Sequence, residues 1–426
     1  MSKLPGTAAW LRSQWSNPKD IFTILFIVGG EIVQVAIAQL CAGPVPNLTP
    51  VSFSFGWLGY AVSALKYSVG EATLMPKPEV ECMLINADTG YARRNYSWVL
   101  SRMLRDFDYW RPPVCDEEEA QKLRDLQQAN SEAWRVYKDM LTNGQGCKAP
   151  ADPGRRSHWS ACDRVVMRFE STQLGIAAIP WGIWGEWLTF WVTGAGTILA
   201  YTSGCLPQWQ EEKVGVGRLK YTERKKERKD VILTEGNGAH DAILIIGCEN
   251  CLDLEALVTP QRTKSNEQFT RWGSGCLAVL WVALLISVAG SDEHTWFLLG
   301  VGMLGALHNI FVAGIKRKPN AFGFDLHYEA TLVEGKVMEV LWEVEKKHPK
   351  AGIAMLPVFF PGKRFPRERL LWEYAEWRSE QVQKLGRETV LQQWVMPSLR
   401  RPESALDDAD IRVKPIPIAK PSVSTA

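Results

Sequence analysis

The sequence lacks the motifs by which common enzyme classes are recognised. It contains no G-x-S-x-G, no H-E-x-x-H, no aspartate-rich D-D-x-x-D and no protein-kinase signature. The turn Gly236-Asn237-Gly238 is not a phosphate-binding loop, because the G-x-x-x-x-G-K pattern is missing. These absences exclude the familiar hydrolases, zinc proteases and kinases, and they leave no recognisable catalytic set.

Metal, disulfide and nucleic-acid signals are also scarce. The single C-x-x-C pair, Cys248 and Cys251, has no second pair to complete a four-ligand zinc site, so no metal or other cofactor is expected. Nine irregularly spaced cysteines do not form a disulfide framework. The net charge is only +2 and no basic stripe is interleaved with aromatic residues, so no nucleic-acid partner is expected. Residues 1–20 have no apolar core, which argues against a cleavable signal peptide.

What the sequence does have is a strict separation of long apolar runs from charged segments. The runs at Ile21–Leu40, Val51–Gly70, Gly273–Gly290 and Thr295–Ile315 each approach the length of about 20 residues that crosses a bilayer. A further apolar stretch occupies residues 169–204. The pattern predicts an α-helical integral membrane protein with about six membrane segments and a mixed α+β cytosolic layer.

The central stretch is predicted to enter the membrane and return, with a break at Gly185-Glu186. Its second half, Trp187–Gly204, is long enough to span. The first half contains Glu170, Gln173 and Pro180, and it is expected to be short or re-entrant. Tryptophans recur every three or four residues on one expected helical face, which favours an interfacial belt over a substrate cage: Trp181, Trp184, Trp187 and Trp191.

Lysine and arginine set the expected orientation. The N-terminal segment and Lys316–Lys318 are basic, whereas the hairpin tips Cys41–Pro50 and Ser291–His294 carry no Lys or Arg. Both termini are therefore predicted to be cytosolic, in an internal (endoplasmic reticulum-type) or plasma membrane. The expected segments are 1–20, 21–70 (first hairpin), 71–168, 169–204 (central hairpin), 205–272, 273–315 (last hairpin), 316–396 and a disordered tail at 397–426.

The charged segments are expected to pack together as one layer. Asp116–Met140 has a helical composition, and the turn at Gly236-Asn237-Gly238 joins two short predicted strands, Val231–Thr234 and Ala242–Ile246. Leu252–Leu257 is expected to begin a helix. Two further amphipathic helices are predicted after the last apolar run, with a turn region between them: Gly335–His348, Arg367–Val395 and the turn Pro357–Pro366.

Polar residues inside the apolar runs are the candidate site residues, because ionisable groups at membrane depth are costly and often functional. Glu31, Glu186 and His308 are candidate acids or bases, and Gln34, Gln173 and Asn309 are candidate ligand-binding residues. Each has a structural alternative. Glu31 and Gln34 can form a buried pair that fixes helix packing, His308 can hydrogen-bond a neighbouring helix, and Glu186 can be a solvated turn residue.

Several segments resemble a family of uncharacterised multi-pass membrane proteins of filamentous fungi. They are Asn17-Pro18-Lys19-Asp20-Ile21-Phe22, Pro50–Leu58, Gln173–Trp187, Leu206-Pro207-Gln208-Trp209 and Leu233-Thr234-x-Gly236-Asn237-Gly238. The resemblance covers most of Asn17–Trp372, and it implies a multi-pass fold without an assigned activity. Some family members lie near natural-product biosynthesis genes. The chain departs from the family pattern at Arg168 and Glu170, where a more apolar segment is expected.

Two classes of function follow. One is an accessory or scaffold protein that holds pathway enzymes at the cytosolic face of a membrane, with the lipid bilayer as its other partner. The other is a membrane-embedded enzyme, of cyclase or isomerase type, acting on a lipophilic intermediate. Transport is a third possibility, although no internal repeat supports it. Convergence of Glu31, Gln173, Glu186 and His308 on one cavity would favour the enzyme.

Overall fold

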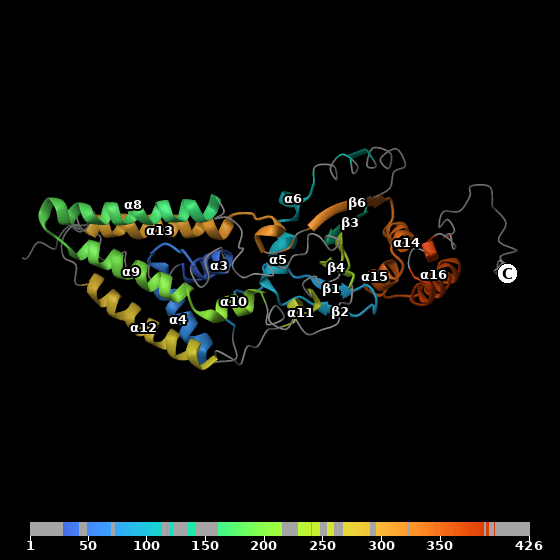
Figure 1. Ribbon diagram of the computed structural model, residues 1–426, viewed down its shortest axis with the longest axis horizontal. Helices are drawn as coiled ribbons and strands as arrows, with labels where there is room; N and C mark the ends of the chain where they lie inside the picture. Colours follow the sequence, from blue (N-terminus) through green and yellow to red (C-terminus); the bar gives the residue numbers. More distant parts are fainter. Residues whose placement is uncertain are drawn as a thin grey trace, which may run out of the picture.

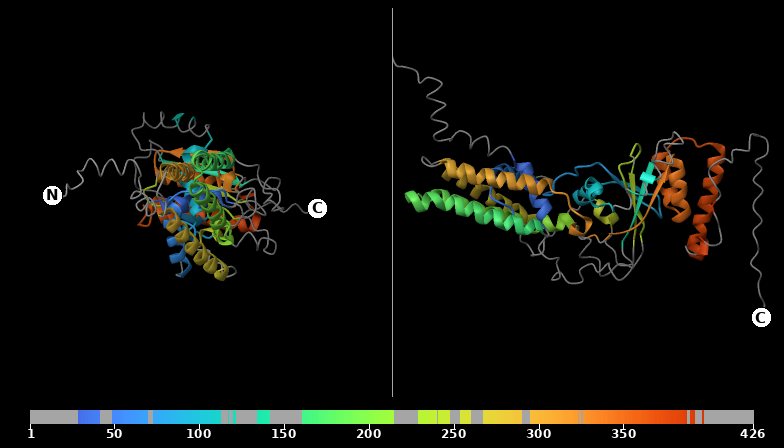
Figure 2. Two further views of the ribbon diagram at one scale, coloured as in Figure 1. Left: turned by 90° about the vertical axis from the view of Figure 1, so that its left-hand side faces the viewer. Right: turned by 90° about the horizontal axis from the view of Figure 1, so that it is seen from above.

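A computed structural model describes residues 29–41, 49–69, 73–112, 117, 120–121, 134–141, 161–214, 229–239, 241–247, 254–259, 267–289, 295–322, 324, 326–386, 389–391 and 396. The described chain is elongated. A bundle of long helices occupies one end, a six-stranded sheet lies in the middle, and a group of C-terminal helices covers the other end (Figure 1). The same order is seen from above (Figure 2).

In the part of the chain that the structure describes, the bundle contains four long helices and two shorter ones. The long ones are α8 (Ala161–Trp184), α9 (Leu188–Gly204), α12 (Glu267–Ala289) and α13 (Thr295–Gly314), and the shorter ones are α3 (Gly30–Leu40) and α4 (Gly56–Val69). Among the described residues, α12 and α13 are the two helices long and apolar enough to cross a membrane. The predicted helices at 273–290 and 295–315 are thereby confirmed. Residues 21–28 of the first apolar run lie outside the described residues.

The predicted break at Gly185-Glu186 is confirmed. Gly185 adopts a φ of 75°, a left-handed conformation that suits glycine, and its N–H bonds to the carbonyl of Trp181 at 3.0 Å. The third segment, predicted to be short or re-entrant, forms the C-terminal part of α8, which is a continuous helix of 24 residues that includes Pro180. Its charged first half extends the helix beyond the apolar residues that the prediction counted. The break also separates the four tryptophans, so they do not share one helical face.

The first hairpin differs most from its prediction. Instead of two antiparallel helices, α3 and α4 have their N-terminal ends together inside the bundle: a Cβ on Gly30 would lie 2.8 Å from the backbone of Gly59. The C-terminal end of α3 lies at the sheet end of the bundle, where Gln39 Nε2 donates to the carbonyl of Ile315 at 3.0 Å. The predicted helix over 51–70 begins only at Gly56.

Between α3 and α4, residues 49–55 pass back into the bundle without forming a helix or a strand. We call residues 49–55 the inserted segment. All seven are buried. The segment starts at the sheet end, where the Thr49 hydroxyl donates to the carbonyl of Gly204 at 2.8 Å. Cys41 and Thr49, the described residues on either side of the predicted tip, therefore both lie near the sheet, and residues 42–48 lie outside the described residues.

The sheet has the order β2-β1-β4-β5-β3-β6. Its strands are β1 (Met83–Asn86), β2 (Ala92–Arg94), β3 (Trp134–Leu141), β4 (Val231–Thr234), β5 (Asp241–Ile246) and β6 (Leu326–Glu334). β3 and β5 are parallel, and the other described pairs are antiparallel. The predicted β4–β5 hairpin is confirmed. The predicted helix over Asp116–Met140 is wrong from Trp134 onward, where the chain pairs with strands on both sides.

Alternate strand residues supply two hydrophobic cores. Leu233 and Ile243 belong to a core that continues through α5 (Trp98–Arg105) and α11 (Leu254–Val258) into the bundle. Ile232 and Leu244 point to the opposite core, formed with α14 (Val337–Lys347), α15 (Ala351–Phe359) and α16 (Pro366–Leu385). Burial on both faces explains why these short strands are almost wholly apolar. Three smaller elements lie between bundle and sheet: α6 (Phe107–Trp110), α10 (Pro207–Val214) and the 3-10 helix η2 (Pro319–Phe322).

The prediction that the charged segments form one layer is confirmed for the described elements, since β4–β5, α14 and α16 share the second core. We call the sheet and its covering helices the α+β layer. Two details of the prediction are wrong. The turn region predicted at Pro357–Pro366 begins only at Phe360, because α15 continues through Pro357 to Phe359, and α16 ends at Leu385 before Gly386, which has a φ of 84°. The predicted helix continued to Val395.

Candidate functional site

Polar side chains from two long helices converge on the inserted segment. Gln173 of α8 donates through Nε2 to the carbonyl of Phe53 at 2.9 Å. Asn309 of α13 donates through Nδ2 to the carbonyl of Ser52 at 3.2 Å and to Ser54 Oγ at 3.1 Å. Non-helical backbone inside a bundle has carbonyls that no helix satisfies, and these two amides satisfy the carbonyls of Ser52 and Phe53.

His308 is the third member of the cluster. Its Nδ1 lies 2.8 Å from Ser52 Oγ, and its ring stacks on Phe169 of α8 with centroids 4.8 Å apart. Its Nε2 has no hydrogen-bond partner among the described residues, and the same holds for Gln173 Oε1 and Asn309 Oδ1. All three side chains are buried to at least 98%. The three predicted residues Gln173, His308 and Asn309 are therefore brought together, and their hydrogen bonds are to backbone carbonyls and serine hydroxyls.

Glycines in the facing helices make room for the aromatic residues of the inserted segment. Phe53 packs against Gly196 of α9, and Phe55 packs against Gly302 of α13. A Cβ at either glycine would come within 2.4 Å or 2.0 Å of the ring it faces. The sequence Val-Ser-Phe-Ser-Phe alternates apolar and polar residues, a period of two that suits an extended chain and not a helix.

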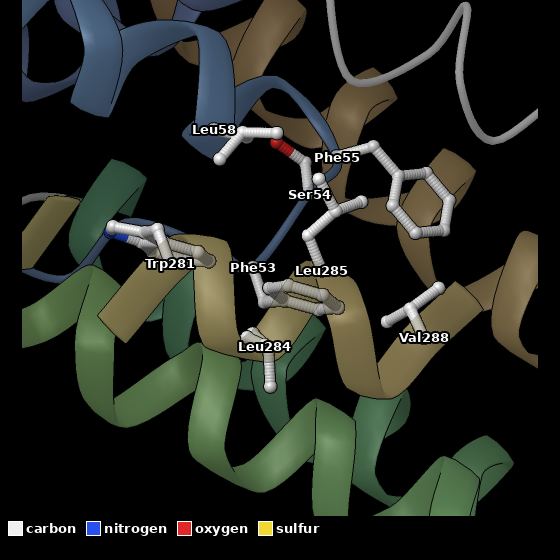
Figure 3. A pocket seen from close by; sticks show the side chains of 8 residues that line it. All are labelled: Phe53, Ser54, Phe55, Leu58, Trp281, Leu284, Leu285 and Val288. Carbon is white, nitrogen blue, oxygen red and sulfur yellow. The ribbon is translucent and has the colours of Figure 1, made fainter. Parts of the chain in front are cut away.

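The space beside the inserted segment is almost completely filled. Figure 3 shows the small cavity between Phe53, Ser54, Phe55 and Leu58 on one side and four residues of α12 on the other: Trp281, Leu284, Leu285 and Val288. Its volume is about 10 Å³. The rings of Phe53 and Trp281 stack with an interplanar angle of 4°. Ligand pockets usually have volumes of about 300–1,000 Å³, so this cavity holds at most a water molecule.

The other three predicted residues lie elsewhere. Glu31 is exposed at the start of α3, whereas Gln34 is buried and donates to the carbonyl of Leu74 at 2.8 Å. Glu186 is half-buried in the break between α8 and α9, at the far end of the bundle. Glu31 and Gln34 thus do not form a buried pair. The proposed acids and bases Glu31, Glu186 and His308 do not gather at one cavity.

Two polar contacts in the bundle were not anticipated. Glu170 is buried and accepts a hydrogen bond from the hydroxyl of Tyr201 in α9. In the sequence, Glu170 stands out only as a departure from an apolar pattern. Ser52 and Ser54 were likewise missed, although their alternation with Val51, Phe53 and Phe55 is a signal that was present.

A second polar cluster joins the bundle to the α+β layer. The buried Arg102 of α5 donates to the carbonyl of Ala313 at the end of α13, and Lys213 of α10 donates to the carbonyls of Gln39 and Cys41 at 3.1 and 2.6 Å. We call these contacts the junction. Cations suit helix C-termini, where carbonyls are unpaired and the helix dipole is negative.

On the side of the α+β layer, carboxylates neutralise the arginine side chains of the junction. Arg102 Nη1 contacts Glu79 at 2.5 Å, and Arg105 contacts both Glu79 and the buried Asp106 at 2.7 Å. Burial lowers the pKa of the Arg102 guanidinium, and the charge of Glu79 opposes that shift. Asp106 also accepts from the backbone N–H of Arg317 at 3.0 Å. This network fixes the ends of α3 and α13 to the layer.

No group of three or more His, Cys, Asp or Glu side chains in the described part of the chain is arranged to hold a metal ion. Cys248 and Cys251 lie outside the described residues. No family model, curated protein or solved structure matches the chain. The geometry of the bundle and the junction is therefore the basis for a functional assignment.

Proposed function

We propose that the chain is a multi-pass integral membrane protein that acts as a non-catalytic scaffold, with its α+β layer held rigidly at the membrane surface. The observation that carries the membrane assignment is the apolar surface of the bundle. Large apolar side chains are exposed along the middle of the bundle helices: Ile198, Val279, Leu280, Val282, Ile286, Met303, Leu307, Ile310 and Phe311. Exposure of so many large apolar side chains on three helices of one bundle is unusual for a water-soluble protein.

Exposed aromatic residues lie at both ends of this surface. At the far end are Trp181, Trp184, Trp187, Trp191 and Trp296, each at least 44% exposed. At the sheet end of α12 are Phe269 and Trp272, which are 63% and 76% exposed. Aromatic side chains favour the two interfaces of a bilayer. This arrangement supports the interfacial belt over a substrate cage.

The dimensions of the bundle agree with a bilayer. α12 has 23 residues and α13 has 20, which correspond to lengths of about 34 and 30 Å at 1.5 Å per residue. The hydrocarbon core is about 30 Å thick. In this proposal α8, α9, α12 and α13 cross the membrane, while α3 and α4 start within it and both run toward the layer.

The scaffold role is supported by what the buried polar groups do. Gln173, His308 and Asn309 hold the inserted segment, and Arg102 and Lys213 hold the junction, so both clusters rigidify the molecule. A rigid layer at the membrane surface suits the positioning of other proteins. On the resemblance to the fungal family, the partners we propose are enzymes of a natural-product pathway, in a cytosol-facing internal or plasma membrane.

Membrane insertion and topology are tested together. Wild-type protein is expected to stay in the membrane pellet after alkaline carbonate extraction. Epitope tags are inserted after Thr89 in the layer, after Glu186 in the bundle break, and at residue 45. In selectively permeabilised cells, the tags at 89 and 45 are expected on one side and the tag at 186 on the other. Carbonate release, or a tag at 186 on the same side as that at 89, would refute the membrane proposal.

The non-catalytic role has a separate test. In the native host, the chromosomal copy is replaced by variants E31Q, E186Q or H308Q at matched protein level. Metabolite output is expected to stay at the wild-type level in all three, because none of these groups lines either of the two cavities found among the described residues. Loss of product in any variant that retains its protein level would overturn the scaffold role and support an enzyme.

A further inference from the structure

A second cavity lies where the chain leaves α13 and enters β6. It has a volume of about 120 Å³, opens to the surface, and is lined by Trp110, Lys318, Pro319, Asn320, Phe324 and Leu326. This is twelve times the volume of the cavity at the inserted segment. It is large enough for a tetrahedral anion such as a phosphate group.

The polar side chains of this pocket are free to bind a ligand. Lys318 is exposed, and neither its ammonium group nor the side-chain amide of Asn320 has a hydrogen bond or ion pair with the described part of the chain. Trp110 Nε1 already donates to the carbonyl of Met103 at 2.9 Å, so Trp110 offers its ring to the pocket. One ammonium, one amide and an apolar wall therefore face the same space.

The two cations next to Lys318 in the chain, Lys316 and Arg317, do not line the pocket. Arg317 turns inward, where its guanidinium donates to the carbonyl of Gln39 at 3.2 Å and its backbone N–H donates to Asp106. Lys316 is exposed but does not line the pocket. Lys318 is thus the cation that distinguishes the pocket from the general basic character of Lys316–Lys318.

The depth of the pocket follows from the proposed membrane position, on which this inference rests. The last exposed apolar side chains of α13 are Ile310 and Phe311, and the helix ends at Gly314. The headgroup regions add only about 5–8 Å to each side of the hydrocarbon core. Lys318 is the first residue after α13 that lines the pocket, and it lies four residues beyond the end of the helix. The pocket therefore lies at the depth of lipid phosphates on the layer side.

We propose that this pocket binds the phosphate of an anionic phospholipid headgroup, with Lys318 as the charged contact and Asn320 as the hydrogen-bond donor. Basic residues just beyond a membrane helix attract anionic lipids, which supports a lipid over free phosphate. Phe324, Leu326 and the Trp110 ring supply an apolar wall for the glycerol portion of the lipid. Such a bound lipid would hold the layer against one leaflet.

The proposal is tested with purified full-length protein in a phosphate-free detergent. Dioctanoyl phosphatidylglycerol is titrated and its ³¹P NMR signal is followed, with inorganic phosphate and dioctanoyl phosphatidylcholine titrated in parallel. Binding of the anionic lipid is expected to be saturable and tighter than that of either other probe. The variants K318A and N320A are expected to weaken it, K318A by about tenfold, as for loss of one charge-assisted contact.

Two matched lysine variants serve as controls. K316A removes an exposed cation two residues away, and K363A removes an exposed cation in the loop before α16. Both are expected to bind the lipid as the wild type does. Equal loss in K316A and K318A would show diffuse surface attraction and overturn the pocket. Equal binding of inorganic phosphate would overturn the lipid assignment, and so would the absence of saturable lipid binding by the wild type.

Carbonate extraction of each variant separates this inference from the proposed function. K318A protein that stays in the membrane pellet but has lost lipid binding supports both. Wild-type protein that stays in the pellet and shows no preference for the anionic lipid refutes only the pocket. Wild-type protein released by carbonate refutes the membrane assignment itself.

Discussion

Gly305 of α13 lies directly against the carbonyl oxygen of Phe53. A Cβ added at Gly305 would be 1.7 Å from that oxygen and 2.6 Å from Nε2 of Gln173, which donates to the same carbonyl. No side-chain rotation relieves a clash with backbone. The helix and the inserted segment can therefore approach this closely only with glycine at position 305.

The first prediction concerns this contact. G305A is expected to displace α13 from the inserted segment and to destabilise the protein by about 1–3 kcal/mol, the usual cost of overpacking a core. Thermal unfolding of the detergent-solubilised protein measures the effect. G300A, in the same helix, has nothing within 4 Å of the added Cβ and is exposed, so its melting temperature is expected to be unchanged or higher. Equal melting temperatures for G305A and the wild type would contradict the close contact.

The second prediction concerns Gln173. Q173L keeps a similar volume but leaves the Phe53 carbonyl without the hydrogen bond that it accepts at 2.9 Å. An unsatisfied buried acceptor costs about 1–3 kcal/mol, so Q173L is expected to lower the free energy of unfolding by that amount and to lower the melting temperature. The neighbouring variant T172A alters an exposed hydroxyl bonded within α8, and it is expected to have little effect. If T172A and Q173L behave alike, Gln173 does not hold the inserted segment.

The third prediction concerns the junction. R102M removes a cation whose side chain is fully buried, and it leaves the end of α13 without its donor. Removing one partner of a buried ion pair costs about 3–5 kcal/mol, although Arg105 partly compensates here by contacting the same carboxylates. R102M is expected to speed limited proteolysis between α13 and β6, measured by mass spectrometry of the fragments.

The matched control uses an exposed pair. Arg94 and Glu81 also contact each other at 2.5 Å, but their side chains are 63% and 83% exposed. Exposed pairs contribute at most about 1 kcal/mol, so R94M is expected to leave the cleavage rate near that of the wild type. Faster cleavage in R94M than in R102M would mean that the junction does not couple the two parts.

The fourth prediction concerns pH. Burial raises the pKa of Glu345 in α14 from 4.5 to about 7, although the backbone N–H groups of Lys350 and Ile353, the Ser379 hydroxyl and Arg378 all act to lower it. The folded state therefore binds a proton that the unfolded state releases between about pH 4.5 and 7. The contribution of Glu345 to stability is fully present below pH 4.5 and is lost as the pH rises through about 7.

Thermal melting of the α+β layer between pH 5 and 8 measures this effect. The free energy of unfolding is expected to fall with rising pH by on the order of 3 kcal/mol from this group. E345Q cannot titrate, so its stability is expected to change less over the same range. S379A removes the hydroxyl that donates to Oε1 of Glu345 at 2.8 Å. The pKa of Glu345 is then expected to rise further, so that the loss of stability occurs at higher pH. An E345Q profile as steep as that of the wild type would exclude Glu345 as the cause.

The long helices and the β4–β5 hairpin were predictable because each has a strong local signal. α13 and the part of α12 from Gly273 onward are long apolar runs, and Gly236-Asn237-Gly238 is a turn sequence between two apolar runs. The break at Gly185 was predictable for the same reason. These features depend on neighbouring residues and need no knowledge of distant partners.

The inserted segment was not predicted, because the apolar composition of the run was given more weight than its alternation of apolar and polar residues. Val51–Gly70 is apolar enough for a helix, yet Val51, Phe53 and Phe55 alternate with serines, and glycines far along the chain receive the two rings. β6 was also not predicted from the sequence, although the first residues of this strand alternate between half-buried and exposed. The meeting of Gln173, His308 and Asn309 could not be predicted, since it depends on how α8, α13 and the inserted segment pack.

The strand order has a consequence for how the protein is made. β3 lies between β5 and β6, and β6 follows α13 in the chain, so the ribosome must synthesise every bundle helix before the last strand exists. Until then, one edge of β3 carries unpaired backbone groups. Completion of the sheet is therefore a late step of biosynthesis, and chains truncated before residue 326 would present an open strand edge to chaperones and proteases.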